Sequence, residues 1–251
     1  MTAPVLTICL GVKDWYLDHL ERCLGSLRAQ CDAPIVVADL SVTARSVGRV
    51  ATVYGATTVA EPQEIWSRAR ALNRAAARAE TPWLVFTDAD MIFPPTWWAA
   101  VMAALAAPVA GAEPVCWLTR SRDIRQPLMG FLPPDGVLSA EVLVAMSDLH
   151  PTVGQGAGMI VPRRWFEEVG GFDETYQTWG GEDNDLTLRV EWAGGTVQWL
   201  PDPTRAFAAH QWHDRTWPTH ADLAQVDRNR AYLAARIAAG GPIARNRAGK
   251  D

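Results

Sequence analysis

Short apolar segments recur along the first part of the chain at the spacing of strands in a layered fold. Apolar runs over residues 4–11, 33–41 and 83–90 indicate buried strands. Residues 49–61 are also rich in valine and threonine, and we expect a further strand there. Four strand regions therefore precede the middle of the chain.

Segments with helical spacing separate these strands. Apolar residues recur at helical intervals over 14–30, and residues 62–80 form an Ala- and Arg-rich helix that opens at a proline. The alternation of strand and helix predicts an α/β fold with a doubly wound, largely parallel sheet. Ligands of such sheets bind at the carboxyl ends of the strands, where Asp39, Asp88 and Asp90 all fall.

The second part of the chain continues the alternation with longer connections. Residues 119–136 hold Pro, Gly and charge, which predicts a long loop, a candidate for closure over a ligand together with the segment after His210. Further helices are expected over 94–105, 141–149, 163–169, after Gly181 and over 221–239, and further strands over 158–161 and 196–202, with 203–220 left as strand or loop. No repeat or linker divides the chain, so residues 1–251 are expected to form one domain.

Composition narrows the class of protein. The chain has 251 residues, 49% of them hydrophobic, which is enough for one sizeable core. A net charge of −5 without a basic stripe argues against nucleic-acid binding. Four cysteines without CxxC spacing indicate reduced, buried thiols of a cytoplasmic protein, and no apolar run has the length of a membrane span. Twelve tryptophans suit a protein that stacks sugar rings or bases on indoles.

Two aspartates, Asp88 and Asp90, close the apolar run WLVFT with a single residue between them. Residues i and i+2 of a strand share a face, so both carboxylates are able to point at one cation. Hard oxygen ligands suit Mg²⁺ or Mn²⁺, which bind a diphosphate alongside carboxylates. The alternative is a solvated turn without a metal, because DxD triplets also arise by chance.

A second acidic segment, WGGEDND, covers residues 179–185. Its two glycines allow a close backbone approach to a ligand, and Asp183 or Asn184 is placed to cap the helix that follows. A plain glycine turn with an acidic N-cap is one interpretation. The other is a general-base carboxylate with the Trp179 indole beside it to stack on a sugar face, since three acids exceed what one cap requires.

Histidine and arginine side chains complete the candidate chemistry. His210 directly follows the apolar run AFAA and is the favoured metal ligand, with His213 as the alternative. Arg68, with Asn73 on the same helix, offers a guanidinium fork for a phosphate or base contact. The alternative for this helix is a solvated basic face.

These segments, in this order, resemble an inverting nucleotide-sugar glycosyltransferase of the GT-A fold. TDAD resembles the DxD signature of such enzymes. GGFDE followed by WGGEDNDL resembles the segment shared by family-two chondroitin-polymerase-like enzymes and β-1,4-galactosyltransferases, and WSRARALN resembles the nucleotide-contacting helix of the latter. The similarity runs from about residue 5 to about residue 215.

The resemblance implies a single GT-A domain with a mixed, mostly parallel Rossmann-like sheet flanked by helices. Residues from 1 to about 100 would form the nucleotide-binding half, about 101–220 the acceptor-binding and catalytic half, and 221–251 a closing helix and tail. The implied donor contacts are Asp39 at the uracil or ribose, Arg68 and Asn73 along the nucleotide, and Asp88 at the ribose or metal. The implied metal ligands are Asp90, His210 and Asp88; Asp183 would be the base, Glu182 would position the acceptor, and Trp179, Gly181 and Asp185 would line the acceptor site.

The expected function is a metal-dependent inverting transfer of a sugar from a nucleotide-diphosphate sugar, with UDP-sugar favoured, to an acceptor hydroxyl. Mn²⁺ or Mg²⁺ is the expected cofactor, and the acceptor is a glycan, a natural product or a peptide. Inversion follows from a single carboxylate base with no second nucleophile nearby, and from the resemblance. The alternatives are a sugar-phosphate nucleotidyltransferase and a non-catalytic carbohydrate-binding module.

Overall fold

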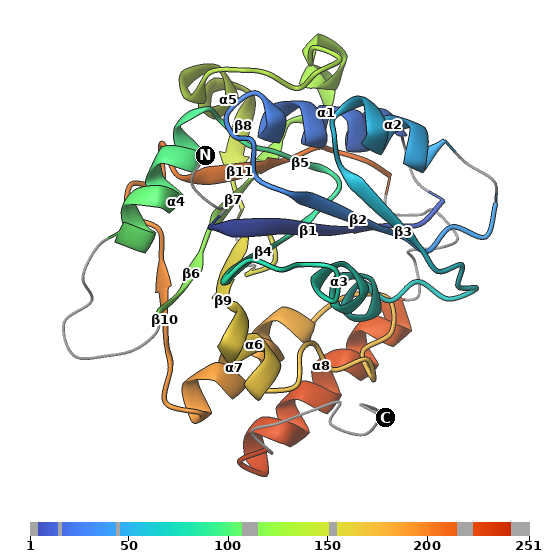
Figure 1. Ribbon diagram of the computed structural model, residues 1–251, viewed down its shortest axis with the longest axis vertical. Helices are drawn as coiled ribbons and strands as arrows, with labels where there is room; N and C mark the ends of the chain where they lie inside the picture. The colour runs from blue at the N-terminus through green and yellow to red at the C-terminus, as the bar shows by residue number, and fades with distance from the viewer. Residues whose placement is uncertain are drawn as a thin grey trace.

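A computed structural model shows how these segments assemble. It describes residues 5–14, 17–43, 46–106, 115–150, 155–214 and 223–241. A large twisted sheet runs through the molecule with helices on both faces, and a smaller sheet lies beside it (Figure 1). None of the helices in these residues combines the length and apolarity that crossing a bilayer requires.

The large sheet is mixed and mostly parallel, as the sequence predicts. Its strands, in the order β10-β6-β9-β4-β1-β2-β3, are Thr196–Trp199, Val115–Leu118, Met159–Pro162, Trp83–Asp88, Leu6–Val12, Ile35–Asp39 and Thr57–Ala60. β9 is antiparallel to both of its neighbours, β4 and β6, while the other pairs are parallel. The carboxyl ends of β1, β2 and β4 therefore share one edge, which carries Asp39 and Asp88.

A smaller, four-stranded sheet brings the second half of the chain to this edge. Its strands, in the order β5-β11-β7-β8, are Met91–Ile92, Phe207–His210, Arg120–Ile124 and Ser147–Leu149. β5 begins directly after Asp90, and His210 pairs with Met91 in the antiparallel register of β11 and β5. This pairing places a histidine from late in the chain against the DxD turn.

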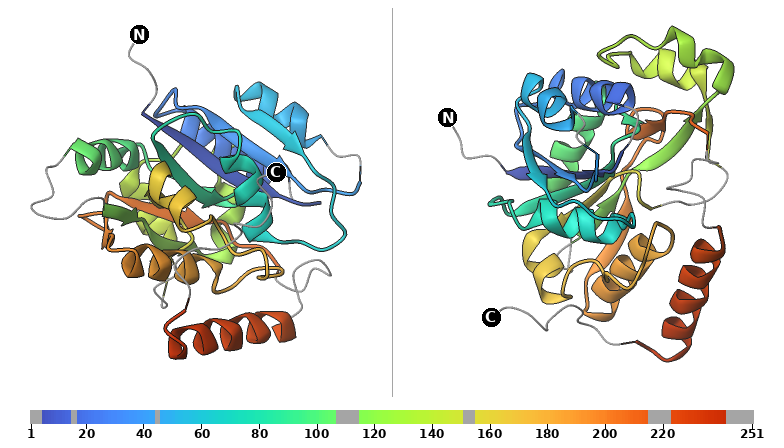
Figure 2. Two further views of the ribbon diagram at one scale, coloured as in Figure 1. Left: turned by 60° about the horizontal axis from the view of Figure 1, so that its bottom comes forward. Right: turned by 90° about the vertical axis from the view of Figure 1, so that its right-hand side faces the viewer.

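Helices cover the two faces of the large sheet in separate groups (Figures 1 and 2). The helices are α1 (Leu17–Arg28), α2 (Val47–Val53), α3 (Arg68–Ala76), α4 (Thr96–Ala106), α5 (Ala140–Met146), α6 (Arg163–Glu168), α7 (Glu182–Trp192) and α8 (Leu223–Ala238), with a 3₁₀ helix, η1, at Gln126–Phe131. Residues of α1, α2 and α4 share one buried cluster, and residues of α3, α6 and α7 share the other.

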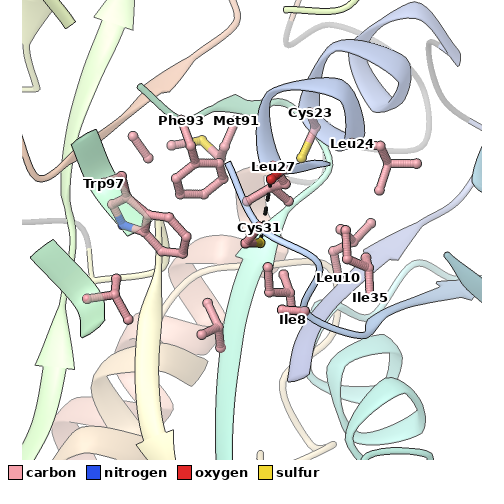
Figure 3. Packing of buried hydrophobic residues seen from close by; sticks show 14 of the residues in the cluster. Ile8, Leu10, Cys23, Leu24, Leu27, Cys31, Ile35, Met91, Phe93 and Trp97 are labelled. Atoms are coloured by element: carbon pink, nitrogen blue, oxygen red, sulfur yellow. Dashed lines mark hydrogen bonds between the residues drawn. The ribbon is translucent and has the colours of Figure 1, made fainter. Parts of the chain in front are cut away.

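Alternate side chains of one strand pack into the two different clusters. Leu6, Ile8 and Leu10 of β1 point into the α1 cluster, whereas Cys9 between them points into the α3 cluster. Figure 3 shows the first of these cores, where Leu24 and Leu27 of α1 pack near the β1 side chains and Trp97 lies further along. All four cysteines are buried free thiols that form no disulfide, as predicted.

Three predicted segments differ from the structure. Residues 49–61 hold helix α2 before the short strand β3, because Val47 and Ala51, one turn apart, bury the same helix face. The loop predicted over 119–136 is wrong, because the segment contains β7 and η1. The sequence RSRDI of β7 has four polar residues of low strand propensity, so it gives no strand pattern. The third helix starts at Arg68 rather than at Pro62, because the Ser67 hydroxyl caps it by accepting from the Arg70 N–H at 3.2 Å.

The turn that ends the 119–136 segment is fixed against α1, which argues against closure by that end. A Cβ built on Gly25 of α1 would lie 2.2 Å from the Asp135 carbonyl oxygen, and one on Gly136 would lie 2.4 Å from the Arg22 carbonyl oxygen. Only glycine permits this backbone approach. The carboxyl end of the 119–136 segment is thus packed against α1.

Replacing Gly25 with alanine tests this docking. We expect Gly25→Ala to lower the free energy of unfolding by about 1–3 kcal/mol, because the added methyl group overlaps backbone that has no rotamer to change. The measurement is urea unfolding of both proteins. Gly48→Ala in α2 is the matched control: its Cβ would find only the Thr58 hydroxyl, at 3.9 Å, so we expect no loss or a gain of up to about 1 kcal/mol. Equal effects of the two substitutions would contradict the docked turn.

Candidate active site

The DxD turn lies at the carboxyl end of β4, where the strand stops and the chain turns into β5. The Asp90 carboxylate points inward and is 8% exposed, whereas 37% of the Asp88 side chain is exposed. The backbone of the turn is tied to the end of β11, because the Gln211 N–H donates to the Asp90 carbonyl at 2.8 Å. The two aspartates therefore have different surroundings and different partners.

Asp90 faces two histidines. Its Oδ2 atom lies 3.5 Å from Nε2 of His210 and 3.2 Å from Nε2 of His213. The sequence favoured His210 and kept His213 as the alternative; the structure brings both to the same carboxylate. One ligand atom from each of the three residues lies within 4.8 Å of the others, the arrangement of a cation site.

The polar atoms of this cluster fit a divalent cation. Asp90 Oδ1 is buried and makes no hydrogen bond within the part of the chain that the structure describes. Such an atom is costly to bury unless a ligand meets it. One carboxylate and two imidazoles are a mixed oxygen and nitrogen donor set, which suits Mn²⁺ better than Mg²⁺, since magnesium prefers oxygen alone.

Charge–charge contacts dominate the titration of the cluster. Burial alone would lower the pKa of His210, but the charges of Asp90 and Asp123 raise it to about 10. Burial alone would raise the pKa of Asp90, and the two histidines bring it well below its usual range. In the cation-free protein Asp90 and His210 therefore form an ion pair, and a divalent cation would replace the proton on Nε2 of His210.

Asp123 on β7 joins the cluster from behind. Its Oδ1 atom lies 3.3 Å from Nδ1 of His210, on the opposite side of the ring from Asp90. A carboxylate in this position directs the other ring nitrogen toward the cation site. Sequence analysis missed Asp123, because it falls in the segment predicted as a loop and no neighbouring motif marks it.

The loop that carries His213 is anchored to α1 through a buried side chain. Gln211 is fully buried; its Nε2 donates to the His19 carbonyl at 3.0 Å, and its Oε1 accepts from Arg22 at 3.2 Å. These contacts fix the chain between the two histidines. The predicted closure by the segment after His210 concerns residues that, from 215 to 222, lie outside the described chain.

Arg68, at the start of α3, links the DxD turn to the acidic segment. Its Nε donates to Asp88 Oδ1 at 2.5 Å, Nη1 to Glu182 Oε1 at 3.2 Å, and Nη2 to the Gly156 carbonyl at 2.9 Å. Burial would lower the pKa of this guanidinium, but the surrounding carboxylates, Asp183 included, raise it above its ordinary value. With 5% of its surface exposed, Arg68 is a buried counter-ion, which argues against its predicted place along the nucleotide.

Helix α7 begins at Glu182, with Gly181 rather than Asp183 or Asn184 as its N-cap residue. Gly180 and Gly181 have φ angles of 100° and 97°, which an L side chain rarely adopts, so the glycine pair is required by the turn itself. The predicted cap was therefore wrong by two or three residues. Glu182 and Asp183 instead occupy the first turn of the helix, where its dipole stabilises negative charge.

The two acids of this turn differ in environment. Glu182 is 3% exposed, and its Oε2 atom is buried without a hydrogen bond in the described chain. Burial and the charge of Asp183 raise the pKa of Glu182 to about 7, against the opposing effect of Arg68. Asp183 is half-buried and accepts from the Asn184 N–H at 2.8 Å, so it is the acid with solvent access.

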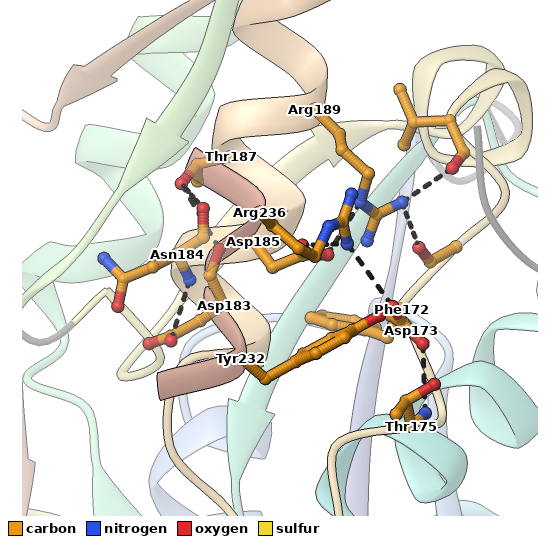
Figure 4. Close-up of polar contacts among 12 residues, drawn as sticks. Phe172, Asp173, Thr175, Asp183, Asn184, Asp185, Thr187, Arg189, Tyr232 and Arg236 are labelled. Atoms are coloured by element: carbon orange, nitrogen blue, oxygen red, sulfur yellow. Dashed lines mark hydrogen bonds and ion pairs between the residues drawn. The ribbon is translucent and has the colours of Figure 1, made fainter. Parts of the chain in front are cut away.

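Asp185 belongs to a buried ion network rather than to the cleft (Figure 4). Its carboxylate, 1% exposed, accepts from Arg189 Nε at 2.7 Å and pairs with Arg236 of α8. Arg236 and Tyr232 also contact Asp173, at 3.3 and 3.0 Å. These partners argue against the predicted acceptor contact by Asp185, because a buried carboxylate with two arginine partners is not open to a substrate.

Asn73 also serves the fold. Its Nδ2 donates to the Phe172 carbonyl and to Glu174, both at 2.9 Å, and its Oδ1 accepts from the Phe172 N–H. It thus fixes the GGFDE loop against α3, and the predicted nucleotide contact is not supported.

Asp39 remains at the carboxyl end of β2, half-buried, with Oδ1 accepting from the Ser41 N–H at 3.0 Å. Trp179 is half-buried beside the glycine pair, and its acceptor role stays a prediction.

Two sequence families match the chain in the regions that form this site. Residues 16–128 match "Glycosyl transferase family 2", and residues 146–214 match "N-terminal domain of galactosyltransferase". Polypeptide N-acetylgalactosaminyltransferase 8 of Drosophila melanogaster is 34% identical over 65 residues, which cover 26% of this chain and 11% of the relative. Polypeptide N-acetylgalactosaminyltransferase 10 of Homo sapiens is 37% identical over 46 residues, which cover 18% of this chain and 8% of the relative. The chain thus matches only about a tenth of the length of these relatives.

Solved structures share the fold across nearly the whole chain. A mannosyltransferase from Pyrobaculum calidifontis in complex with GDP-Man and Mn²⁺ has a TM-score of 0.57 at 19% identity, covering 95% of this chain and 76% of its own. GalNAc-T7 with UDP, GalNAc and Mn²⁺ has a TM-score of 0.58 at 16% identity, covering 92% and 50%. Glucosyl-3-phosphoglycerate synthase from Mycobacterium tuberculosis has a TM-score of 0.60 at 18% identity, covering 96% and 81%.

Together, the two sequence families, the N-acetylgalactosaminyltransferase relatives and the shared fold support a glycosyltransferase of the GT-A type with a family-two-like sequence. The predicted α/β, GT-A fold is confirmed.

The raised pKa of Glu182 predicts a pH dependence of stability. The pKa of Glu182 is about 7 in the folded protein, against an ordinary glutamate pKa of 4.5, so Glu182 binds a proton more tightly when the protein is folded. The free energy of unfolding should therefore fall as pH rises from about 4.5 to about 7, as this proton is lost. Glu182→Gln carries no such proton and should show a flatter profile in urea unfolding at pH 5 and 7.5. Parallel profiles for the two proteins would contradict the assignment.

Proposed function

We propose that the protein transfers a sugar from a nucleotide-diphosphate sugar to an acceptor hydroxyl, and that Asp90, His210 and His213 hold the divalent cation that this donor requires. The observation that carries the proposal is the Asp90 carboxylate at the carboxyl edge of the sheet: its Oδ2 faces two imidazoles, and its buried Oδ1 has no hydrogen bond within the described residues. Mn²⁺ is the favoured ion because of the two nitrogen ligands. Structural neighbours whose descriptions include Mn²⁺ with GDP-Man or UDP support the same class of donor.

Asp39 and Asp88 are the proposed contacts for the nucleoside. Both lie at the carboxyl ends of parallel strands, β2 and β4, which flank β1. Asp88 has one oxygen committed to Arg68 and an exposed fraction that leaves the carboxylate open to a ribose hydroxyl. UDP is the favoured nucleotide. Asp88 is no longer proposed as a metal ligand, because the cluster around Asp90 forms without it.

Asp183 is the proposed general base. It lies in the first turn of α7, has solvent access, and is close enough to Arg68 for the two charges to interact. As the acceptor oxygen attacks the anomeric carbon, Asp183 would take its proton, and the sugar–phosphate bond breaks on the opposite face. A bound divalent cation supplies Lewis-acid stabilisation of the departing diphosphate charge. A single base of this kind gives inversion of the anomeric centre.

Glu182 has a supporting part in this scheme. Its buried carboxylate accepts from Arg68 and so fixes the start of α7 relative to the DxD strand. This placement replaces the predicted direct positioning of the acceptor. The acceptor itself, a glycan, a natural product or a peptide, would lie against Trp179 and the glycine turn.

The two alternative functions make different demands on this site. A sugar-phosphate nucleotidyltransferase would not need a nucleotide sugar as substrate, and a carbohydrate-binding module would need neither nucleotide nor metal. Turnover of a nucleotide sugar that stops with EDTA and returns with Mn²⁺ separates the transferase from both.

The cation site predicts a linked loss of metal and nucleotide binding. Asp90→Asn and His213→Ala should each weaken binding of UDP with Mn²⁺ at least about tenfold by calorimetry, because the diphosphate is held through the ion. Asp148→Asn, which changes an exposed carboxylate on β8, is the control and should bind as the wild type does. Wild-type affinity in the Asp90 and His213 variants would contradict the site.

Removing the base predicts a loss of turnover without a loss of donor binding. Asp183→Asn should lower kcat by about 10²-fold or more, since an amide does not accept the acceptor proton. Its affinity for UDP with Mn²⁺ should stay within about threefold of the wild type, because Asp183 lies outside the cation cluster. Glu191→Gln, an exposed acid further along α7, is the control. A variant that keeps more than about a tenth of the wild-type kcat would exclude Asp183 as the base.

A further inference from the structure

The C-terminal helix α8 lies beyond both family matches, which end at residue 214. It runs along the outer side of the α7 layer (Figure 2). Its buried residues are Val226, Asn229 and Arg236, spaced along one helix face. Two of these three are polar, so α8 is held by directed hydrogen bonds and ion pairs more than by an apolar seam.

Asn229 is the contact between α8 and the WGGED turn. Its side-chain Nδ2 donates to the carbonyl of Gln177 at 2.7 Å and to the carbonyl of Trp179 at 2.9 Å. Its Oδ1 accepts from Gln225 Nε2 at 2.9 Å, which fixes the orientation of the amide. The residue is 3% exposed, so each of these hydrogen bonds is protected from water.

The backbone that Asn229 holds has little intrinsic preference for its conformation. Thr178, Gly180 and Gly181 all have positive φ angles, 59°, 100° and 97°. Glycine populates many other conformations equally well, so contacts from outside must select this one. A Cβ on Gly180 would lie 3.2 Å from the Val226 side chain, which shows how closely α8 covers the turn.

Backbone hydrogen bonds to the start of α3 hold residues 177–181 on the side opposite α8. The Thr178 N–H donates to the Trp66 carbonyl at 2.7 Å, and its carbonyl accepts from the Arg68 N–H at 3.0 Å. Asn229 completes this grip from α8. The ion pairs of Arg236 with Asp173 and Asp185 set the distance between α8 and α7.

We infer that Asn229 is a positioning residue: through the carbonyls of Gln177 and Trp179 it fixes the glycine turn that aims Asp183 at the reacting groups. This inference rests on the proposed function, in which Asp183 is the base. Asn229 touches no reacting atom and acts through the backbone of residues 177–181. The cation cluster lies elsewhere, in the turn between β4 and β5 and at the end of β11, and Asn229 contacts none of its residues.

Asn229→Asp tests this role with a side chain of the same shape. The carboxylate keeps the acceptor for Gln225 but loses both N–H donors. We expect kcat to fall about tenfold or more, since a small displacement of a catalytic group has a large effect on rate. Affinity for UDP with Mn²⁺ should stay within about threefold, and amide hydrogen exchange should rise in residues 177–186 but not in β4.

Two further variants keep the test decisive if Asn229→Asp loses stability. Gln225→Ala leaves both donors in place but frees the amide to rotate, and should give a smaller effect in the same direction. Arg230→Ala removes an exposed residue of the same helix, 68% exposed at its side chain, and should match the wild type. Unchanged kcat in Asn229→Asp would overturn the inference, as would a loss of UDP–Mn²⁺ affinity and of exchange protection throughout the protein, which marks a merely structural role.

The same experiment separates this inference from the proposed function. If the wild type neither binds UDP with Mn²⁺ nor turns over a nucleotide sugar, the proposed function fails. The exchange comparison over residues 177–186 still decides whether Asn229 fixes the turn. If the wild type transfers sugar and Asn229→Asp equals it, the positioning role alone fails.

Discussion

The buried guanidinium of Arg68 joins carboxylates from distant parts of the chain, the buried Glu182 and the partly exposed Asp88. Asp88 ends β4, Glu182 begins α7, and the Gly156 carbonyl precedes β9; all three accept from the same side chain. A buried carboxylate without a partner would cost several kcal/mol. A Cβ at position 156 would lie 3.0 Å from Arg68 Nη2 and 3.3 Å from Asp183 Oδ2, so a larger residue there would have to displace these side chains. The position of the WGGED turn relative to the DxD strand therefore depends on the Arg68 side chain.

The two aspartates of the DxD turn have different charged partners, so their carboxylates have different roles in the structure. Asp88 is neutralised within the protein by Arg68, whereas Asp90 faces only imidazoles and keeps an oxygen without a hydrogen bond in the described chain. The first is stable in place without a ligand. The Asp90 carboxylate keeps one oxygen available to a cation. The donor and acceptor sides of the proposed site are thus joined through Arg68, and α8 supports the acceptor side from outside.

The sequence predicts the framework of the fold well because its strands are apolar runs with clear ends. It also predicts the DxD turn and His210, since acids and a histidine that follow buried strands have few structural uses. It fails for β7, whose polar residues carry no strand pattern, and for α2, whose valines suit either element. Asn73 and Asp185 resemble site residues in the sequence, but the polar atoms of both side chains form hydrogen bonds or ion pairs within the protein. Polar residues that bind ligands and polar residues that fix loops have the same composition, and only their partners distinguish them.

A double-mutant cycle between Arg68 and Glu182 tests the central claim most directly. Arg68→Met should lower the free energy of unfolding by about 3–5 kcal/mol, because it leaves the buried Glu182 carboxylate and the partly exposed Asp88 carboxylate without their cation. Combining it with Glu182→Gln should cost less than the sum of the single changes, by about 1 kcal/mol or more, since the neutral amide no longer needs the guanidinium. Additivity within about 0.5 kcal/mol would show that the two residues do not interact energetically, and would contradict the account.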